Sequence, residues 1–302
     1  MRPTSSHVLA ALPGVAAIAL WGGYRHAIRE YRSIDTTPSI LPGRIRELNT
    51  DWGQLSYRYV SGSSPEPPLV LVHGWGRSSD HVWWQLIEQT DRTVVAVDLP
   101  GHGRSVLEKR FTFARAAHAI ERSVDHAGLG SAILVGHSMG GPIALTAIRQ
   151  SGTNRFAGLV AIATSAYWVR PRHRIMVASA PYLFAPRSPI VTGAMRAETR
   201  SRPGHAAQVA ADYAMRPRRR VLAESAAELM RFDARDWSDL RIPPAIWIVT
   251  AEDSVVPPGD QRASANHFGI DTVEITSDHP ALTRVPSEVC AIIENSFRAP
   301  RW

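Results

Sequence analysis

The chain has 302 residues, of which 44% are hydrophobic and 20% charged, with a formal net charge of +7, as expected for one large globular domain or two small ones. This composition excludes a disordered chain, a collagen-like repeat and a coiled coil. The single cysteine, Cys290, excludes an internal disulfide framework and a cysteine-based zinc cluster, and its place on a predicted apolar helix favours a buried structural thiol.

The first predicted element is an apolar segment at the amino terminus. Residues 8–24 contain no charged side chain, and three arginines follow within residues 25–32. The segment is at the lower length limit for a helix that spans a bilayer, and the basic flank favours retention on the cytoplasmic side. We therefore expect residues 1–35 to anchor the protein to a membrane, with the rest of the chain in the cytoplasm. The alternatives are a signal peptide cleaved near Ala17 and Ala19, which would place the protein in the cell envelope or outside the cell, and a helix packed on the domain.

Strand patterns begin after residue 44. Two short runs, 45–48 and 55–60, flank Asp51, Trp52 and Gly53 and predict a hairpin. Five later runs are continuously apolar, which indicates strands buried on both faces, as in a parallel sheet covered by helices. These five runs are residues 69–73, 93–98, 132–136, 159–163 and 245–250.

Helical patterns separate these strands. Phe113, Ala117, Ile120 and Val124 recur at helical spacing, and so do the apolar residues after Met139. A short strand at 272–275 and a final helix at 286–297 end the pattern. Because strands alternate with helices, we predict one doubly wound, mostly parallel α/β domain over residues 44–302.

The alternation is interrupted between residues 166 and 240. Residues 166–220 contain 11 arginines against two acids, a local charge of +9 that leaves −2 for the rest of the chain. Aromatic and methionine side chains lie between these arginines. We predict a helical lid insertion whose cationic face is either solvated or approaches anionic lipids or acidic substrates. Nucleic acid is not an expected partner, because no nucleic-acid-binding motif accompanies the charge.

The residues Gly136-His137-Ser138-Met139-Gly140 form a G-x-S-x-G pattern at a predicted strand-to-helix turn. A serine projecting from so tight a turn needs small residues two positions before and after it, because these relieve contacts with neighbouring chain. The alternative is a glycine-rich turn with an incidental serine. The position between a buried strand and an amphipathic helix favours a nucleophile at Ser138.

A second motif lies at the end of an earlier strand, His73-Gly74-Trp75-Gly76, and the segment from Asp98 to Ser105 reads D-x-P-G-x-G-x-S. With the serine turn, these motifs resemble the α/β-hydrolase family over about residues 44–165 and 243–298. The resemblance implies the α/β-hydrolase fold and an oxyanion hole formed by main-chain N–H groups. It assigns those donors to Trp75 and Met139, and turn-shaping roles to His73, Gly74, Gly76, Gly136, His137 and Gly140.

A nucleophilic serine needs a base, and the base needs a partner that fixes its tautomer. The resemblance implies the chain order serine, acid, histidine. We predict Asp253 as the acid, in the loop after the strand ending at Thr250, with the neighbouring Glu252 as the alternative. We predict His279 as the base. Relatives more often have glycine before this histidine, and this chain departs from that pattern with Asp278 before it and Pro280 after it.

These residues predict a serine esterase that acts through an acyl-enzyme intermediate, without a cofactor or a metal. The serine nucleophile disfavours haloalkane dehalogenase and epoxide hydrolase chemistry, which uses aspartate. The expected partner is a small-molecule ester, and residues 8–24 and the arginine-rich insertion suggest a lipid or acylglycerol ester at a membrane, as in lipase-like relatives. The alternatives are hydrolysis of C–C bonds, thioesters or lactones by the same three residues, or a small-ligand receptor on this scaffold.

Overall fold

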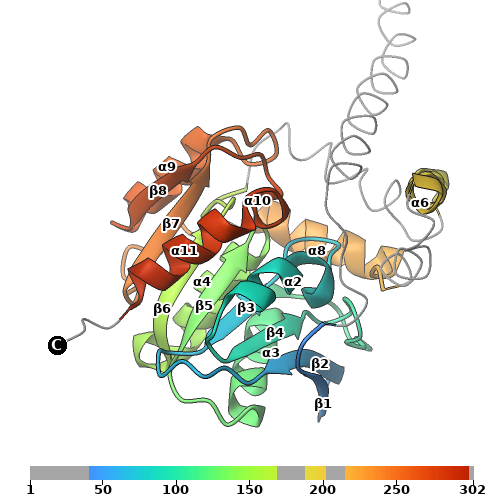
Figure 1. Ribbon diagram of the computed structural model, residues 1–302, viewed down its shortest axis with the longest axis horizontal. Coiled ribbons are helices and arrows are strands. Elements are labelled where there is room, and N and C mark those ends of the chain that lie inside the picture. Colours follow the sequence, from blue (N-terminus) through green and yellow to red (C-terminus); the bar gives the residue numbers. More distant parts are fainter. Residues whose placement is uncertain (1–40, 169–187, 202–214, 299–302) are drawn as a thin grey trace, which may run out of the picture.

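The computed structural model describes residues 41–168, 188–201 and 215–298, and all statements below concern these residues (Figure 1). They form a sheet of eight strands in the order β1-β2-β4-β3-β5-β6-β7-β8. The first two pairs, β1–β2 and β2–β4, are antiparallel, and the remaining pairs are parallel. The strands are β1 (Arg44–Thr50), β2 (Gly53–Val60), β3 (Leu69–Val72), β4 (Val94–Asp98), β5 (Ala132–His137), β6 (Phe156–Ile162), β7 (Ala245–Thr250) and β8 (Asp271–Ile275).

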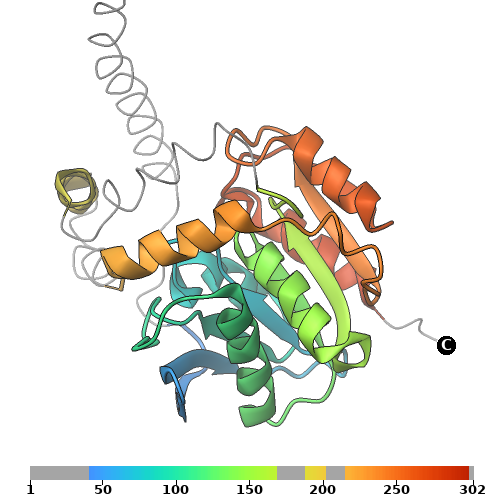
Figure 2. The same cartoon turned by 180° about the vertical axis from the view of Figure 1, so that it is seen from behind.

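Helices cover both faces of the sheet (Figures 1 and 2). One hydrophobic core contains residues of α2, α10 and α11, and the other contains residues of α3, α4, α8 and α9. The helices are α2 (Ser79–Gln89), α3 (Phe113–His126), α4 (Gly140–Ser151), α6 (Pro189–Ser201), α8 (Arg219–Arg231), α9 (Pro258–His267), α10 (Ala281–Arg284) and α11 (Pro286–Ser296), with a short 3₁₀ turn, η1 (Thr153–Arg155). The predicted mostly parallel α/β architecture is confirmed.

The two cores explain why the strand sequences are continuously apolar. In β3, Val70 and Val72 pack into one core, and Leu69 and Leu71 pack into the other. Because successive side chains point to opposite faces, a strand covered on both faces needs an apolar residue at every position. The predicted strand at 159–163 begins earlier in the structure, at Phe156, which pairs with Ala132 across a register shift.

The insertion between β6 and β7 contains α6 and α8 in its described part. Its two ends are joined, because Trp168 donates its main-chain N–H to Phe232, and Ala234 donates to Ala166, at 3.0 and 2.9 Å. Helix α8 lies across the sheet in Figure 2. Within the described ranges no helix is long and apolar enough to cross a bilayer, and the predicted anchor at residues 8–24 lies outside those ranges.

Candidate active site

Ser138 lies on the tight turn between β5 and α4, with a φ of 53° in the left-handed region. This conformation is strained for a residue with a side chain and is held by hydrogen bonds. The Ser138 N–H donates to the Ile162 carbonyl at 3.0 Å, and the Thr164 hydroxyl donates to the Ser138 carbonyl at 2.6 Å. The turn requires glycine at position 140, where a Cβ would lie 2.1 Å from the main-chain oxygen of Val72.

Three side chains that are far apart in the sequence form one hydrogen-bonded chain. The Nδ1 of His279 lies 2.8 Å from Asp253 Oδ2, and its Nε2 lies 3.0 Å from Ser138 Oγ. Because an ionised carboxylate only accepts, Nδ1 carries the hydrogen and Nε2 presents its lone pair to the serine hydroxyl. The arrangement lets the imidazole take the proton of Ser138.

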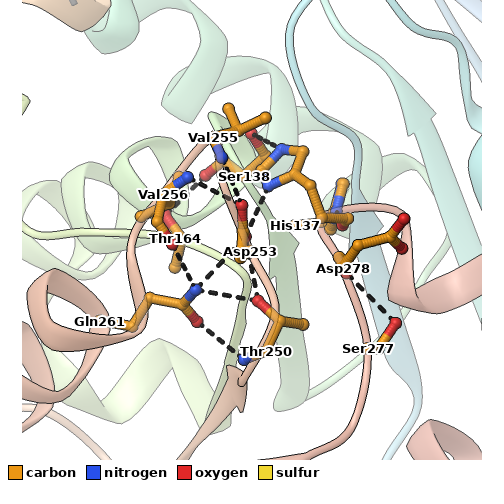
Figure 3. A network of polar contacts seen from close by, with 11 residues as sticks. His137, Ser138, Thr164, Thr250, Asp253, Val255, Val256, Gln261, Ser277 and Asp278 are labelled. Atoms are coloured by element: carbon orange, nitrogen blue, oxygen red, sulfur yellow. Dashed lines mark hydrogen bonds and ion pairs between the residues drawn. The ribbon is translucent and has the colours of Figure 1, made fainter. Parts of the chain in front are cut away.

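The Asp253 carboxylate is held from several sides (Figure 3). Its Oδ1 accepts from the main-chain N–H groups of Val255 and Val256, both at 2.8 Å, and its Oδ2 accepts from Thr250 Oγ1 at 3.0 Å and Gln261 Nε2 at 3.3 Å. Burial raises the pKa of Asp253, but the hydrogen bond and charge of His279, together with these donors, outweigh it and lower the pKa below its usual value. The carboxylate is therefore ionised when His279 needs a partner.

Glu252, the alternative acid, is exposed, and its main-chain N–H donates to the Ser277 carbonyl at 3.0 Å. The carboxylate that contacts His279 belongs to Asp253. Gln261 was missed by sequence reasoning. Gln261 lies on the buried side of α9 together with Asp260 and Ser264. Because this buried side is largely polar, the helix lacks the apolar periodicity by which a helix is recognised in a sequence.

The predicted oxyanion loop lies against Ser138. A Cβ on Gly74 would lie 3.1 Å from Ser138 Cβ, so the loop that contains Trp75 passes directly beside the serine. Met139 is fully buried and immediately precedes α4. The Trp75 indole donates to the Leu222 carbonyl of α8 at 3.0 Å. A Cβ on Gly76 would lie 3.3 Å from Leu222 Cδ2, so α8 rests on this loop.

His73 joins the oxyanion loop to the loop that follows β4. Its Nε2 accepts from the Leu99 main-chain N–H at 3.1 Å, so the hydrogen is on Nδ1, which donates to the Gly74 carbonyl at 2.8 Å. Burial, and then the neighbouring His102, lower the pKa of His73 well below its usual value. The ring is neutral and acts as a fixed crosslink between the two loops.

A buried group of charges supports the start of α2, directly after the oxyanion loop. Asp80 receives two hydrogen bonds from Arg58, at 2.7 and 2.9 Å, and pairs with Arg104 at 2.8 Å. Asp98 accepts from the main-chain N–H groups of Ser79 and Arg104, at 2.8 and 3.0 Å. Sequence reasoning assigned a structural role to the loop that begins at Asp98 but missed this network, whose members come from β2, α2, the end of β4 and the loop after it.

The loop that carries His279 has contacts at Asp278 and at the main chain of His279 itself. Asp278 Oδ1 lies 3.6 Å from Arg284 Nε, and the Asp278 side chain points away from Asp253 in Figure 3. The Nε2 of His137 lies 3.0 Å from the main-chain oxygen of His279. Asp278 therefore lies outside the hydrogen-bonded chain of Ser138, and its presence leaves His279 in reach of the serine.

The described residues contain no group of three or more histidine, cysteine, aspartate or glutamate side chains that could hold a metal ion. Cys290 is buried on α11, and burial raises the pKa of its thiol to about 11, as in a cysteine that packs rather than reacts. His102 is buried as well and donates from Nδ1 to the Pro100 carbonyl at 3.2 Å.

Comparisons with known proteins place these features in a family. The curated relatives include an sn-1-specific diacylglycerol lipase of Xenopus tropicalis, 35% identical over 32% of this chain and 31% of the relative. A pimeloyl-[acyl-carrier protein] methyl ester esterase of Vibrio parahaemolyticus is 36% identical over 33% of this chain and 37% of the relative. The matched part thus spans about a third of each relative.

The solved structure of a hydrolase from Pseudomonas aeruginosa matches 85% of this chain and 99% of its own, with a TM-score of 0.68 and 22% identity. At this identity the likeness concerns the fold. The sequence profile described as the alpha/beta hydrolase family matches residues 69–292, a stretch that includes Ser138, Asp253 and His279. The chain therefore belongs to the alpha/beta hydrolase family.

Proposed function

We propose that the protein is a serine hydrolase that cleaves carboxylic esters through an acyl-enzyme intermediate. The observation that carries the proposal is the continuous chain from Ser138 Oγ through His279 to Asp253, with contacts of 3.0 and 2.8 Å. A hydroxyl becomes a useful nucleophile only when a base of fixed tautomer takes its proton. The ester-cleaving activities named for two relatives support this class of substrate.

In the first half-reaction, Ser138 Oγ forms a bond to the ester carbonyl carbon while its proton moves to His279 Nε2. Main-chain N–H groups of Trp75 and Met139 are the proposed donors to the oxygen that becomes negative. The bond from carbon to the alcohol oxygen then breaks, and His279 gives its proton to the departing alcohol. Asp253 stabilises the imidazolium while it carries the charge.

In the second half-reaction, water forms a bond to the acyl carbon and gives a proton to His279. The bond to Ser138 Oγ then breaks, the acid leaves, and the serine recovers its proton from the imidazolium. The same base therefore works twice, and its position must remain correct while the serine is acylated. The residues proposed for these steps need no metal or cofactor.

The test of this proposal is turnover of p-nitrophenyl butyrate by Ser138→Ala. We expect a loss of at least about 10⁴-fold in kcat, because nucleophile removal disables the triad as a unit. Ser254→Ala is the matched control, since Ser254 is an exposed serine in the loop after β7. Undiminished hydrolysis by Ser138→Ala would refute the proposal. Tight, saturable ligand binding with negligible turnover by the wild type would identify a receptor instead.

As the substrate class we propose lipid or acylglycerol esters at the surface of an anionic membrane. Support comes from the +9 charge of residues 166–220, from the exposed arginines of α6 and the start of α8, and from the diacylglycerol lipase among the relatives. Membrane attachment through residues 8–24 belongs to the same proposal. Long-chain preference among p-nitrophenyl and glyceryl esters, enhanced by anionic vesicles, would support it. Preference for acetate regardless of vesicles would refute it.

A further inference from the structure

Two contacts, from neighbouring residues of the serine turn, hold the loop of His279. The first is the catalytic contact between Ser138 Oγ and His279 Nε2, at 3.0 Å. The second joins His137 Nε2 to the main-chain oxygen of His279, also at 3.0 Å. The two imidazole rings lie 5.1 Å apart and are tilted by 46°. One contact therefore reaches the reacting ring, and the other reaches the main chain that carries it.

The chemistry of His137 makes its contact a one-way hydrogen bond. The side chain is buried, and burial, together with the nearby His279, lowers the pKa of His137 to about 3, so the ring is neutral at working pH. A carbonyl oxygen only accepts, so Nε2 carries the hydrogen and donates it to His279. The other nitrogen, Nδ1, is buried without a hydrogen-bond partner among the described residues. An unpaired buried nitrogen is costly, which indicates that the ring is placed for its Nε2 contact.

The two contacts differ in when they exist. Under the proposed mechanism, acylation replaces the hydrogen on Ser138 Oγ by the acyl group, so the serine no longer donates to His279. Asp253 still holds the ring through Nδ1. The hydrogen bond from His137 does not involve any atom that changes in the reaction, so it persists through the acyl-enzyme. During that interval it still ties the main chain of His279 to the serine turn.

We propose that His137 is a positioning residue for the second half-reaction, holding His279 beside the acylated Ser138 so that it can take a proton from water. The inference rests on the proposed esterase function and deepens it. It gives His137 a role in the release of the acyl group, whereas the sequence motif assigns this residue only to the shape of the turn. Loss of the hydrogen bond from His137 slows hydrolysis of the acyl-enzyme more than it slows formation of the acyl-enzyme.

The experiment compares two variants of similar size in the full-length protein. His137→Gln keeps an N–H donor near the place of Nε2, whereas His137→Met fills the same space without a donor. With p-nitrophenyl acetate the leaving group departs readily, so the second half-reaction limits kcat, and stopped-flow release of p-nitrophenol resolves both steps. His126→Gln is the control, because His126 lies at the end of α3 and contacts Tyr57 of β2 rather than the serine turn.

For His137→Met we expect kcat to fall about 3- to 10-fold, the effect of one hydrogen bond, with KM falling in parallel and kcat/KM little changed. The initial burst of p-nitrophenol should approach one per active site, and the acylated protein should accumulate in intact-mass spectra. His137→Gln should recover kcat to within about twofold of the wild type.

Equal losses of kcat and kcat/KM without a larger burst would overturn the proposal, and so would a glutamine variant no better than the methionine variant. If His137→Met does not fold, His137→Asn replaces it, because its shorter amide cannot reach the carbonyl of His279. Failure of the esterase proposal is recognised separately: Ser138→Ala would then hydrolyse the ester as fast as the wild type, and no variant would form an acylated protein.

Discussion

The Asp253→Asn substitution replaces one carboxylate oxygen by an amide nitrogen and leaves the size of the side chain almost unchanged. Both oxygens of Asp253 accept hydrogen bonds: Oδ1 from the main chain of Val255 and Val256, and Oδ2 from His279 and two other side chains. An amide turned toward the main chain opposes two N–H groups that cannot rotate. It therefore turns toward His279, whose Nδ1 must then accept, and Nε2 must carry the hydrogen that faces Ser138.

A base with its hydrogen on the wrong nitrogen cannot take the serine proton. We expect kcat/KM for p-nitrophenyl butyrate to fall about 10⁴-fold, the loss typical of a wrong tautomer in such triads, which corresponds to about 5.5 kcal/mol of transition-state stabilisation. The matched control is Glu252→Gln, which makes the same chemical change at the neighbouring exposed carboxylate. The control should remain within about twofold of the wild type, as surface substitutions usually do.

The reasoning would be refuted if Asp253→Asn kept more than about a tenth of the wild-type kcat/KM, since this requires a tautomer that the contacts exclude. It would also be refuted if Glu252→Gln lost activity while Asp253→Asn did not. Thermal melting of both variants separates loss of chemistry from loss of fold. A melting temperature near that of the wild type assigns the effect of Asp253→Asn to the base.

Two further predictions concern stability. Gly140→Ala should lower the free energy of unfolding by about 3 kcal/mol or more, because the new Cβ would lie 2.1 Å from the Val72 oxygen. Gly259→Ala, in open space on α9, should raise the free energy of unfolding by about 0.5 kcal/mol. Urea unfolding measures both values, and similar values for the two variants would contradict the prediction. Burial lowers the pKa of His102 from 6.5 to about 4, so below pH 6.5 the unfolded chain binds the proton first and stability falls. Between pH 7.5 and pH 5 the free energy of unfolding should fall by about 2 kcal/mol more in the wild type than in His102→Asn. If the free energy of unfolding, measured with urea, depended on pH in the same way in both proteins, the prediction would be wrong.

The fold could be predicted from sequence wherever burial dictated the residue type. The strands from β3 to β7 lie between two helical layers, so each contains a continuous apolar run that stands out in the chain. Their order in space could not be read in this way, because β3 lies between β4 and β5 and no local pattern specifies that neighbour. Helix α9 was missed because its buried side is largely polar, with Gln261 donating a hydrogen bond to Asp253.

Part of the candidate site could likewise be predicted from the sequence, and part could not. The residues around Ser138 are recognisable because the strained turn admits few residue types, and Gly140 has no room for a side chain. Asp253 was predicted as the acid with Glu252 as the alternative, because both belong to one loop; in the structure Asp253 is buried and contacts His279, whereas Glu252 is exposed. The pair of Asp80 and Arg58 was missed because charged residues are usually exposed, whereas these two are buried and paired with each other.

Helix α8 belongs to the insertion that would meet a substrate, yet it is fastened to the body of the domain. Trp75 donates to its Leu222 carbonyl, while Glu224 and Glu228 accept from the main-chain N–H groups of Phe111 and Phe113. An engineer who alters this helix to change which molecules are accepted will also disturb the strand-end loop on which it rests. Under the proposed function we therefore expect substitutions in α8 to change substrate selectivity and rate together, and libraries aimed at α8 should be screened for both.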